Sequence, residues 1–318
     1  MKNPQITKKY LISSLTAGLT LGLVSTVSAA TTFNGGPTDD IALAGNWNNG
    51  LPTGPGNPGT LDTTAEWLPA NPTLTNFYLD IIAGGTLNRE DFFQPQTIDG
   101  GVWTINGGSI INTTAVNLSD DAQVTLNTGA ITMGGGRDLG INGTSLFTIG
   151  GGTLTIGDEL NMGGGSFTMN GGTTVINGSG NVGDNFGSNG TFNFDGGSFT
   201  AGNYGANAGT IGVRTVNFGA GSGSVDFTGD FEAFRTTIDW VAGSGMSLTI
   251  AGALSNSGAA TTFEDLYTGG QLLYEGSNAN PFGDNFQVTG STLSLIPEPS
   301  SVALLGLAGL AVCLRRRR

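Results

Sequence analysis

The sequence predicts an all-β fold, a glycine-rich β-solenoid (β-helix) with rungs of about 22 residues. Three observations predict it. Glycine supplies 56 of the 318 residues and punctuates short alternating segments instead of following a collagen-like triplet. One glycine-containing phrase recurs every 20 to 25 residues, and no proline lies between Pro95 and Pro281. Because proline cannot donate to a strand ladder, this stretch suits paired strands, and it shows no helical periodicity.

Residues 1–30 have the organisation of a secretory signal peptide. Three lysines near the start precede an apolar stretch from Tyr10 to Val24, and small residues follow up to Ala29 and Ala30. We expect cleavage after Ala29 or Ala30 and exclude this segment from the fold. An uncleaved N-terminal anchor is the alternative, and the small-residue site argues against it.

Residues 31–80 are predicted to form a cap rich in proline and glycine over the first rung. They contain six of the eleven prolines and several turn signals. The segment Gly45-Asn46-Trp47-Asn48, followed by Gly50-Leu51-Pro52, resembles the N-terminal cap region that precedes the β-solenoids of autotransporter-like bacterial surface proteins. An irregular loop pinned by Trp47 and Trp67 explains the same residues equally well.

Residues 81–254 are predicted to hold the solenoid repeats. Each copy of the phrase consists of two alternating segments joined at a glycine turn, as Phe167, Met169 and Val175 illustrate with their period of two. The first glycines of the clearest copies are Gly84, Gly107, Gly129, Gly151, Gly171 and Gly196. A string of β-hairpins in a sandwich or barrel is a competing interpretation. The steady period and the glycine corners favour stacked rungs.

Stacked rungs would align equivalent side chains into ladders. We expect an interior aromatic ladder of Phe147, Phe167 and Phe192, because the alternation groups these residues with the apolar set. We expect a polar ladder at a turn from Asn106, Asn127, Asn170 and Asp195. An aromatic row would also suit a sugar-binding strip, and core packing is the favoured interpretation.

Residues 255–296 are predicted to form the C-terminal cap, because an array of rungs leaves an apolar end that must be covered. The apolar side chains available for this role are Phe263, Leu266, Tyr267, Leu272, Leu273, Tyr274 and Phe282.

Residues 297–318 are predicted to sort and anchor the protein. Pro297-Glu298-Pro299 precedes an uncharged run from Val302 to Leu314, a helix roughly 20 Å long against a hydrocarbon core of about 30 Å. The run therefore predicts a short, temporary transmembrane helix, helped by snorkelling arginines that stay cytoplasmic. These arginines are Arg315, Arg316, Arg317 and Arg318.

The order of these three parts resembles the PEP-CTERM sorting signal of Gram-negative bacteria. The resemblance implies that an exosortase, a membrane processing enzyme, recognises Pro297, Glu298 and Pro299 and removes the tail. It also implies transient anchoring in the inner membrane, followed by delivery to the cell surface or extracellular matrix. An ordinary tail anchor or a buried terminal helix is the alternative, although a buried helix would not end in four arginines. The resemblance covers some 22 residues and specifies delivery, not activity.

The charge of the body limits its partners and its chemistry. Between the two targeting segments, four arginines face 23 acidic residues, a net charge of −19. Such a surface repels nucleic acid and anionic lipid. The chain has no histidine, and its one cysteine, Cys313, lies in the tail. Histidine-based and cysteine-based catalytic and zinc sites are therefore excluded, and we expect no catalytic residue, bound metal or cofactor.

Carboxylates are the remaining source of chemistry. Adjacent acids occur at several places, and neighbours on a strand point to opposite faces, so we interpret them as solvated loop charges. A polysaccharide-active enzyme would need a cleft that combines carboxylates with an arginine. The residues available for it are Asp120, Asp121, Arg137, Asp138, Asp158 and Glu159.

The sequence therefore predicts a non-catalytic, exported structural protein of the cell surface or extracellular matrix. The alternative is a secreted adhesin that binds polysaccharide, or a polysaccharide-active enzyme on the same scaffold. Beyond the exosortase, the composition leaves extracellular polysaccharide open as a partner.

Overall fold

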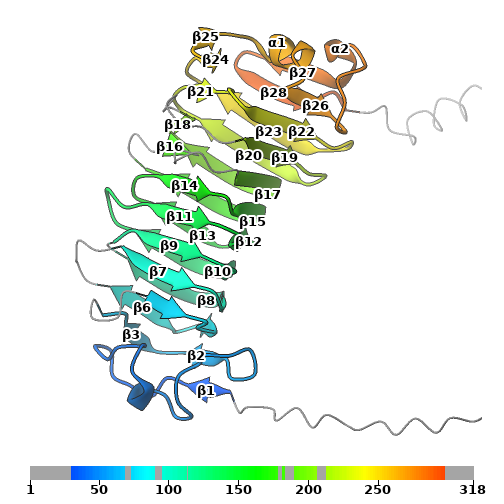
Figure 1. Ribbon diagram of the computed structural model, residues 1–318. Coiled ribbons are helices and arrows are strands. Elements are labelled where there is room, and N and C mark those ends of the chain that lie inside the picture. The colour runs from blue at the N-terminus through cyan, green and yellow to red at the C-terminus, as the bar shows by residue number, and fades with distance from the viewer. Residues whose placement is uncertain are drawn as a thin grey trace, which may run out of the picture.

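The computed structural model describes residues 30–68, 73–89, 95–112, 114–177, 181–182, 190–205 and 213–297. Within these ranges the chain is an all-β solenoid with almost no helix, which confirms the predicted fold class. Figure 1 shows the rungs stacked from β1 (Thr31–Thr32) at one end to β27 (Phe286–Thr289) and β28 (Thr292–Leu295) at the other.

Two sheets run along the stack. The larger contains, besides β1, β27 and β28, the strands β2 (Gly59–Leu61), β3 (Thr64–Glu66), β5 (Leu79–Ile82), β6 (Thr86–Arg89), β8 (Val102–Asn112), β10 (Gln123–Met133), β12 (Leu146–Ile149), β13 (Thr153–Ile156), β15 (Ser166–Ile176), β17 (Gly190–Ala201), β19 (Arg214–Phe218), β20 (Ser222–Phe227), β22 (Thr236–Trp240), β23 (Gly245–Ile250) and β26 (Leu272–Tyr274). The smaller contains β4 (Thr73–Thr75), β7 (Gln96–Asp99), β9 (Val116–Ser119), β11 (Leu139–Asn142), β14 (Leu160–Gly163), β16 (Asn181–Val182), β18 (Asn203–Tyr204), β21 (Phe231–Glu232), β24 (Leu254–Asn256) and β25 (Ala259–Ala260).

Each rung is one circuit of the chain. In a typical rung a long strand of the larger sheet, such as β8, bends at a glycine, and a turn then leads to a short strand of the smaller sheet, such as β9. Successive rungs pair in parallel: Trp103 aligns with Val124, Val124 with Phe147, and Phe147 with Phe167. Parallel pairing at offsets of 20 to 25 residues rules out a string of hairpins, whose neighbouring strands would be antiparallel.

Glycine makes the bend inside the long strands possible. Gly107, Gly129, Gly172 and Gly197 all have positive φ, a conformation that side chains with a Cβ rarely adopt. At Gly129 the rungs are also close together, because a Cβ there would lie 2.1 Å from the carbonyl oxygen of Gly108 in the rung below. Glycine is therefore required at position 129 both by dihedral angle and by stacking distance, whereas at Gly107 the dihedral angle alone requires it.

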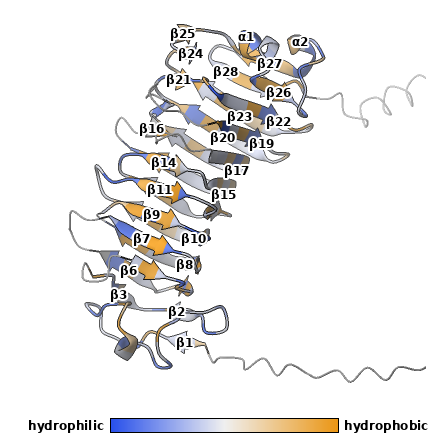
Figure 2. Ribbon diagram, viewed as in Figure 1, coloured by the Kyte–Doolittle hydropathy of each residue, from blue (hydrophilic) through white to orange (hydrophobic). Residues whose placement is uncertain are grey.

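The interior is filled by columns of apolar side chains. The predicted aromatic ladder is confirmed: the ring centroids of Phe147 and Phe167 lie 5.9 Å apart, and those of Phe167 and Phe192 lie 6.3 Å apart. A second column continues through Phe218 and Trp240, whose rings stack at 4.1 Å. Figure 2 shows hydrophobic residues concentrated on β7, β9 and β11, the side of the rung that the smaller sheet forms.

The predicted polar ladder is confirmed for Asn106 and Asn127 and is wrong for Asn170 and Asp195. The Asn127 side chain donates to Asn106 at 2.9 Å, and Asn106 donates to Asp80 at 2.8 Å. Asn170, however, aligns with Gly196 instead of Asp195, because the register between β15 and β17 shifts at this point. Further along the stack, Asn217 donates to Asn193 at 2.8 Å, so a ladder forms there on the outer face of β17 and β19.

Irregular segments close both ends of the stack. Parallel pairing begins at β1 and β2, inside residues 31–80, and the loop between them buries Trp47 against Phe33 and Phe77. This loop contains a single turn of 3-10 helix, η1 (Ala44–Asn46). At the other end lie α1 (Phe263–Thr268), α2 (Phe282–Asn285) and the antiparallel pair β27 and β28.

The apolar residues predicted for the C-terminal cap cover the last rungs. Phe263, Leu266, Tyr267 and Leu272 are buried, whereas Leu273, Tyr274 and Phe282 are half-buried. Among the described residues, no helix has the length and apolar character needed to cross a membrane. The run from Val302 to Leu314, predicted as a transmembrane helix, lies outside the described residues.

Candidate functional site

The C-terminal tail leaves the solenoid directly from its closing strand. β28 pairs with β27 on one side and with β23 of the last full rung on the other, both antiparallel. Leu295, the last residue of β28, is buried, and the backbone N–H of Ile296 donates to the carbonyl of Asn285 at 2.9 Å. Pro297, the first predicted motif residue, is exposed at the edge of the cap. Glu298, Pro299 and the four arginines Arg315, Arg316, Arg317 and Arg318 lie outside the described residues.

A groove of about 670 Å³, with both polar and apolar lining, opens beside this exit point. It is lined by Gly243 and Ser244 before β23, by Gly245 at the start of β23, and by residues of β26, α2, β27 and β28. The side chains and backbone that line it include Ser244, Tyr274, Asp284, Gln287, Ser294 and Pro297. Pro297, the first residue of the predicted motif, therefore lines this groove. The other lining residues come from several elements of the cap, so the groove forms when these elements are assembled.

Comparison with family models decides what this tail is. The model described as the PEP-CTERM protein-sorting motif matches residues 295–318. The chain carries a PEP-CTERM sorting motif. A PEP-CTERM motif implies an exported protein that an exosortase, a membrane processing enzyme, recognises and sorts. The match begins at Leu295, so the PEP-CTERM segment overlaps the last residue of β28. No curated protein and no solved structure matches the chain.

The predicted signal-cleavage site lies at the opposite end of the stack. Ala30 is exposed next to β1, whereas residues 1–29, including Ala29, lie outside the described residues. Because β1 begins at Thr31 and pairs with β2, cleavage after Ala30 would leave the whole fold intact.

Three acidic residues converge at one corner of the rungs. Asp99, Asp120 and Asp121 line a surface hollow together with Thr75 and Thr144. The hydrogen bond to Asp99 and the negative charge of that residue raise the pKa of Asp120 above its ordinary value. The Thr144 hydroxyl donates to the Asp121 carboxylate at 2.6 Å. Nevertheless, among the described residues no group of three or more acidic, histidine or cysteine side chains is arranged to hold a metal ion.

The other acids named for an enzymatic cleft lie at a different corner. Asp138 comes just before β11, and partial burial raises the pKa of its carboxyl, although a hydrogen bond from the backbone of Glu159 opposes the rise. Asp120 comes just after β9, which pairs in parallel with β11. The two positions therefore lie beyond opposite ends of four-residue strands, roughly 17 Å apart. The structure thus divides the acids between two corners, with Arg137 and Asp158 at the Asp138 corner.

The remaining acidic pairs have local structural roles. Asp39 accepts a hydrogen bond from the backbone of Gly36, and Asp40 is buried and accepts one from Ala42 at 3.0 Å. Asp265 completes a capping box at the start of α1 with Thr262. The pair Glu90-Asp91 lies outside the described residues.

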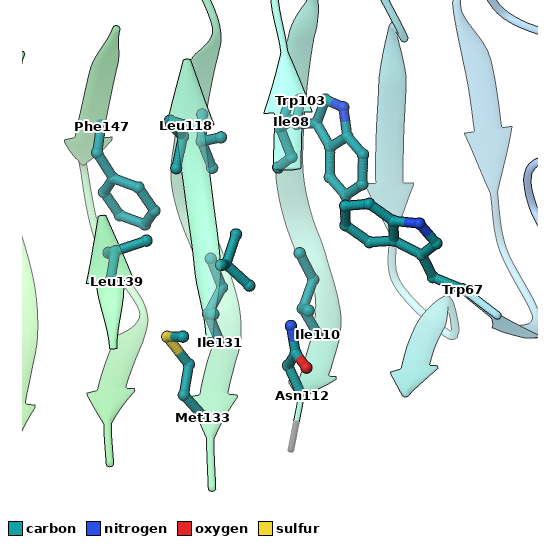
Figure 3. Close-up of a pocket in the computed structure, with 12 residues that line it drawn as sticks. Trp67, Ile98, Trp103, Ile110, Asn112, Leu118, Ile131, Met133, Leu139 and Phe147 are labelled. Atoms are coloured by element: carbon teal, nitrogen blue, oxygen red, sulfur yellow. The ribbon is translucent and has the colours of Figure 1, made fainter. Parts of the chain in front are cut away.

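A cavity of about 30 Å³ lies inside the solenoid between Trp67, Trp103, Met133 and Phe147 (Figure 3). The side chains around it are almost all apolar and buried, and the one amide among them, that of Asn112, accepts hydrogen bonds from the backbone and hydroxyl of Thr114. Small apolar cavities of this kind remain dry. We therefore interpret it as a packing void in the core and not as a ligand site.

Glu232, whose closeness to Arg235 in the sequence suggests only a surface ion pair, organises the turn before the cap. The Glu232 carboxylate accepts hydrogen bonds from the Ser255 hydroxyl at 2.9 Å and from the backbone of Phe234, Ser257 and Gly258 at 2.8 to 3.0 Å. Partial burial raises its pKa, but the four donors outweigh burial and lower the pKa below its ordinary value. Glu232 thereby joins β21 to the turn that connects β24 with β25.

Replacing Glu232 by glutamine is expected to reduce the free energy of unfolding by about 1 kcal/mol at pH 7 in low salt. A carboxylate with a lowered folded pKa stabilises the protein above its unfolded pKa of about 4.3, and the contribution is lost as the pH falls through the folded value. The gap between the two proteins should therefore narrow as the pH falls below about 4.3. Urea unfolding at pH 7 and pH 3.5 would measure it. Glu264→Gln, at an exposed position on α1, is the control, and a gap as large at pH 3.5 as at pH 7 would contradict the assignment.

Proposed function

We propose that this protein is a non-catalytic structural rod of the cell surface or extracellular matrix, released there by removal of its PEP-CTERM tail. The observation that carries the proposal is the attachment of the sorting motif to a closed, rigid solenoid within two residues of its last strand. Export requires only the two targeting segments, and the body supplies a rod with polar outer columns and an apolar interior. The candidate acids lie at two corners, Asp120 and Asp121 at one, and Asp138, Asp158 and Glu159 beside Arg137 at the other.

Mass spectrometry of both ends of the mature chain, in membrane, surface and medium fractions of the native host, tests this proposal. We expect an N-terminus at Ala30 or Thr31, the loss of residues beyond about Pro299, and the mature chain at the surface or in the matrix. A chain with Arg315, Arg316, Arg317 and Arg318 all replaced by alanine should keep its tail and accumulate unprocessed, because the stop that places the motif outside is lost. An intact Arg318 in the inner-membrane fraction of the wild type would overturn the proposal.

Extracellular polysaccharide is the partner that we propose for the rod in the matrix. The support is the outer face of the larger sheet, where the column through Thr104, Thr125, Thr148 and Thr168 presents hydroxyls rung after rung. Pull-down of the mature protein on polysaccharide isolated from the host should retain it. An assay for new reducing ends or unsaturated products should stay negative, and activity in it would favour the alternative, a polysaccharide-active enzyme.

A further inference from the structure

We propose that the groove beside β28 is a docking surface for the exosortase, so that the enzyme binds the folded cap as well as the linear tail. This inference rests on the proposed function, since it requires that the tail be processed. It adds a second recognition element, built from residues of the cap that the sorting motif does not include.

The first argument is reach. Only Ile296 and Pro297 separate the buried end of β28 from Glu298, and two extended residues span at most about 7 Å. Ile296 does not add free length, because its N–H is bonded to the carbonyl of Asn285 in α2. An enzyme that holds Glu298 in its active site must therefore touch the cap around Pro297, and the groove is the hollow in that surface.

The second argument is chemistry. Of the described residues that line the groove, Asp284 is the one with a charge, and it is exposed. The other liners include amide and hydroxyl groups, such as those of Gln287 and Ser294, and the apolar side chains of Leu295, Ile296 and Pro297. Residues 255–297 contain no lysine or arginine. The complementary partner is a protein surface with basic or hydrogen-bond-donating side chains, and complementary charge at an interface of this kind speeds encounter.

The third argument is the order of assembly. The groove needs β26, α2, β27 and β28 together, and β28 is the last strand before the tail. A chain whose cap has not closed exposes the motif but lacks the groove. Recognition of both the groove and the motif would favour processing of completely folded molecules. Lipid headgroups are the competing occupant of the groove, and the experiment must distinguish them from the exosortase.

A pulse-chase measurement of tail removal in the native host, with the full chain, tests the inference. Asp284→Lys is expected to slow removal at least about threefold, because it reverses the charge of the groove. Glu264→Lys is the matched control: it makes the same charge change at an exposed position in the first turn of the other cap helix, outside the groove. It should leave the rate unchanged. Equal thermal unfolding midpoints for the two variants would exclude a folding defect.

A further variant separates docking from other effects of the lysine. An insertion of roughly six Gly and Ser residues between Ile296 and Pro297 adds about 20 Å of chain and detaches the motif from the cap. In this background Asp284→Lys should no longer slow removal. The inference is overturned if Asp284→Lys matches the wild type, or if it speeds removal, as attraction of the lysine to anionic lipid headgroups would predict. It is also overturned if Glu264→Lys slows removal equally, or if the slowing persists in the extended chain. A wild-type tail that is never removed would instead overturn the proposed function itself.

Discussion

Replacing Gly129 by alanine is expected to cost at least about 3 kcal/mol in the free energy of unfolding, because two penalties act at this corner. Gly129 has φ of 99°, outside the range that alanine adopts without strain. The added Cβ would also lie 2.1 Å from the carbonyl oxygen of Gly108, a backbone atom that can move only if the rung below moves. Chemical unfolding of the mature chain, followed by circular dichroism, would show a much lower midpoint.

Gly243→Ala is the control that separates the two penalties. Gly243 has φ of 75°, but no atom lies within 4 Å of the position of its Cβ. Only the dihedral strain applies there, and the expected cost is about 1 kcal/mol. If both variants lost the same stability, close stacking of the rungs would not be what requires glycine at position 129.

Truncation of Phe167 to alanine is expected to cost about 3 to 5 kcal/mol. Its side chain is fully buried, and its ring contacts those of Phe147, Phe192 and Phe199 at centroid distances of 5.9 to 6.3 Å. Both neighbouring rungs are held in place by the same parallel strands, so they can close little of the resulting cavity.

Thr148→Ala is the control for that experiment. Thr148 follows Phe147 on the same strand and points to the outer face, so its removal should change stability by less than about 0.5 kcal/mol. A small effect of Phe167→Ala, comparable with that of Thr148→Ala, would contradict the aromatic ladder as the source of cohesion between these rungs.

The regular parts of the rung were predictable from the sequence because they are encoded locally. Glycine pairs such as Gly107-Gly108 mark the bend, and the alternation around Phe167 and Met169 assigns each side chain to the inside or the outside. The short strand that each rung contributes to the smaller sheet was not predicted. Strands such as β9 and β14 contribute only two or three inward residues after turns of varying length, too few for a period of two to be recognised.

The cap and the buried polar groups depend on contacts between distant residues. The apolar residues of the C-terminal cap were predicted as a set, but the closure of β23 by β28 joins residues some 45 positions apart and leaves no local pattern. Nothing near Arg214 in the sequence indicates that it is buried with its guanidinium over the ring of Tyr204 at 5.3 Å. The sorting motif, in contrast, was predicted from its residues alone, because it is a contiguous stretch of sequence and does not depend on contacts between distant residues.

The placement of the two chain ends sets a physical length. The column that aligns Thr32 of β1 with Asp239 of β22 passes through ten strands, about 43 Å at the usual spacing between strands. The first rung therefore lies about that distance from the last rungs, beside which the PEP-CTERM motif begins. Each added or deleted rung would change the length of the solenoid by about 4.8 Å and would leave the sorting motif unchanged.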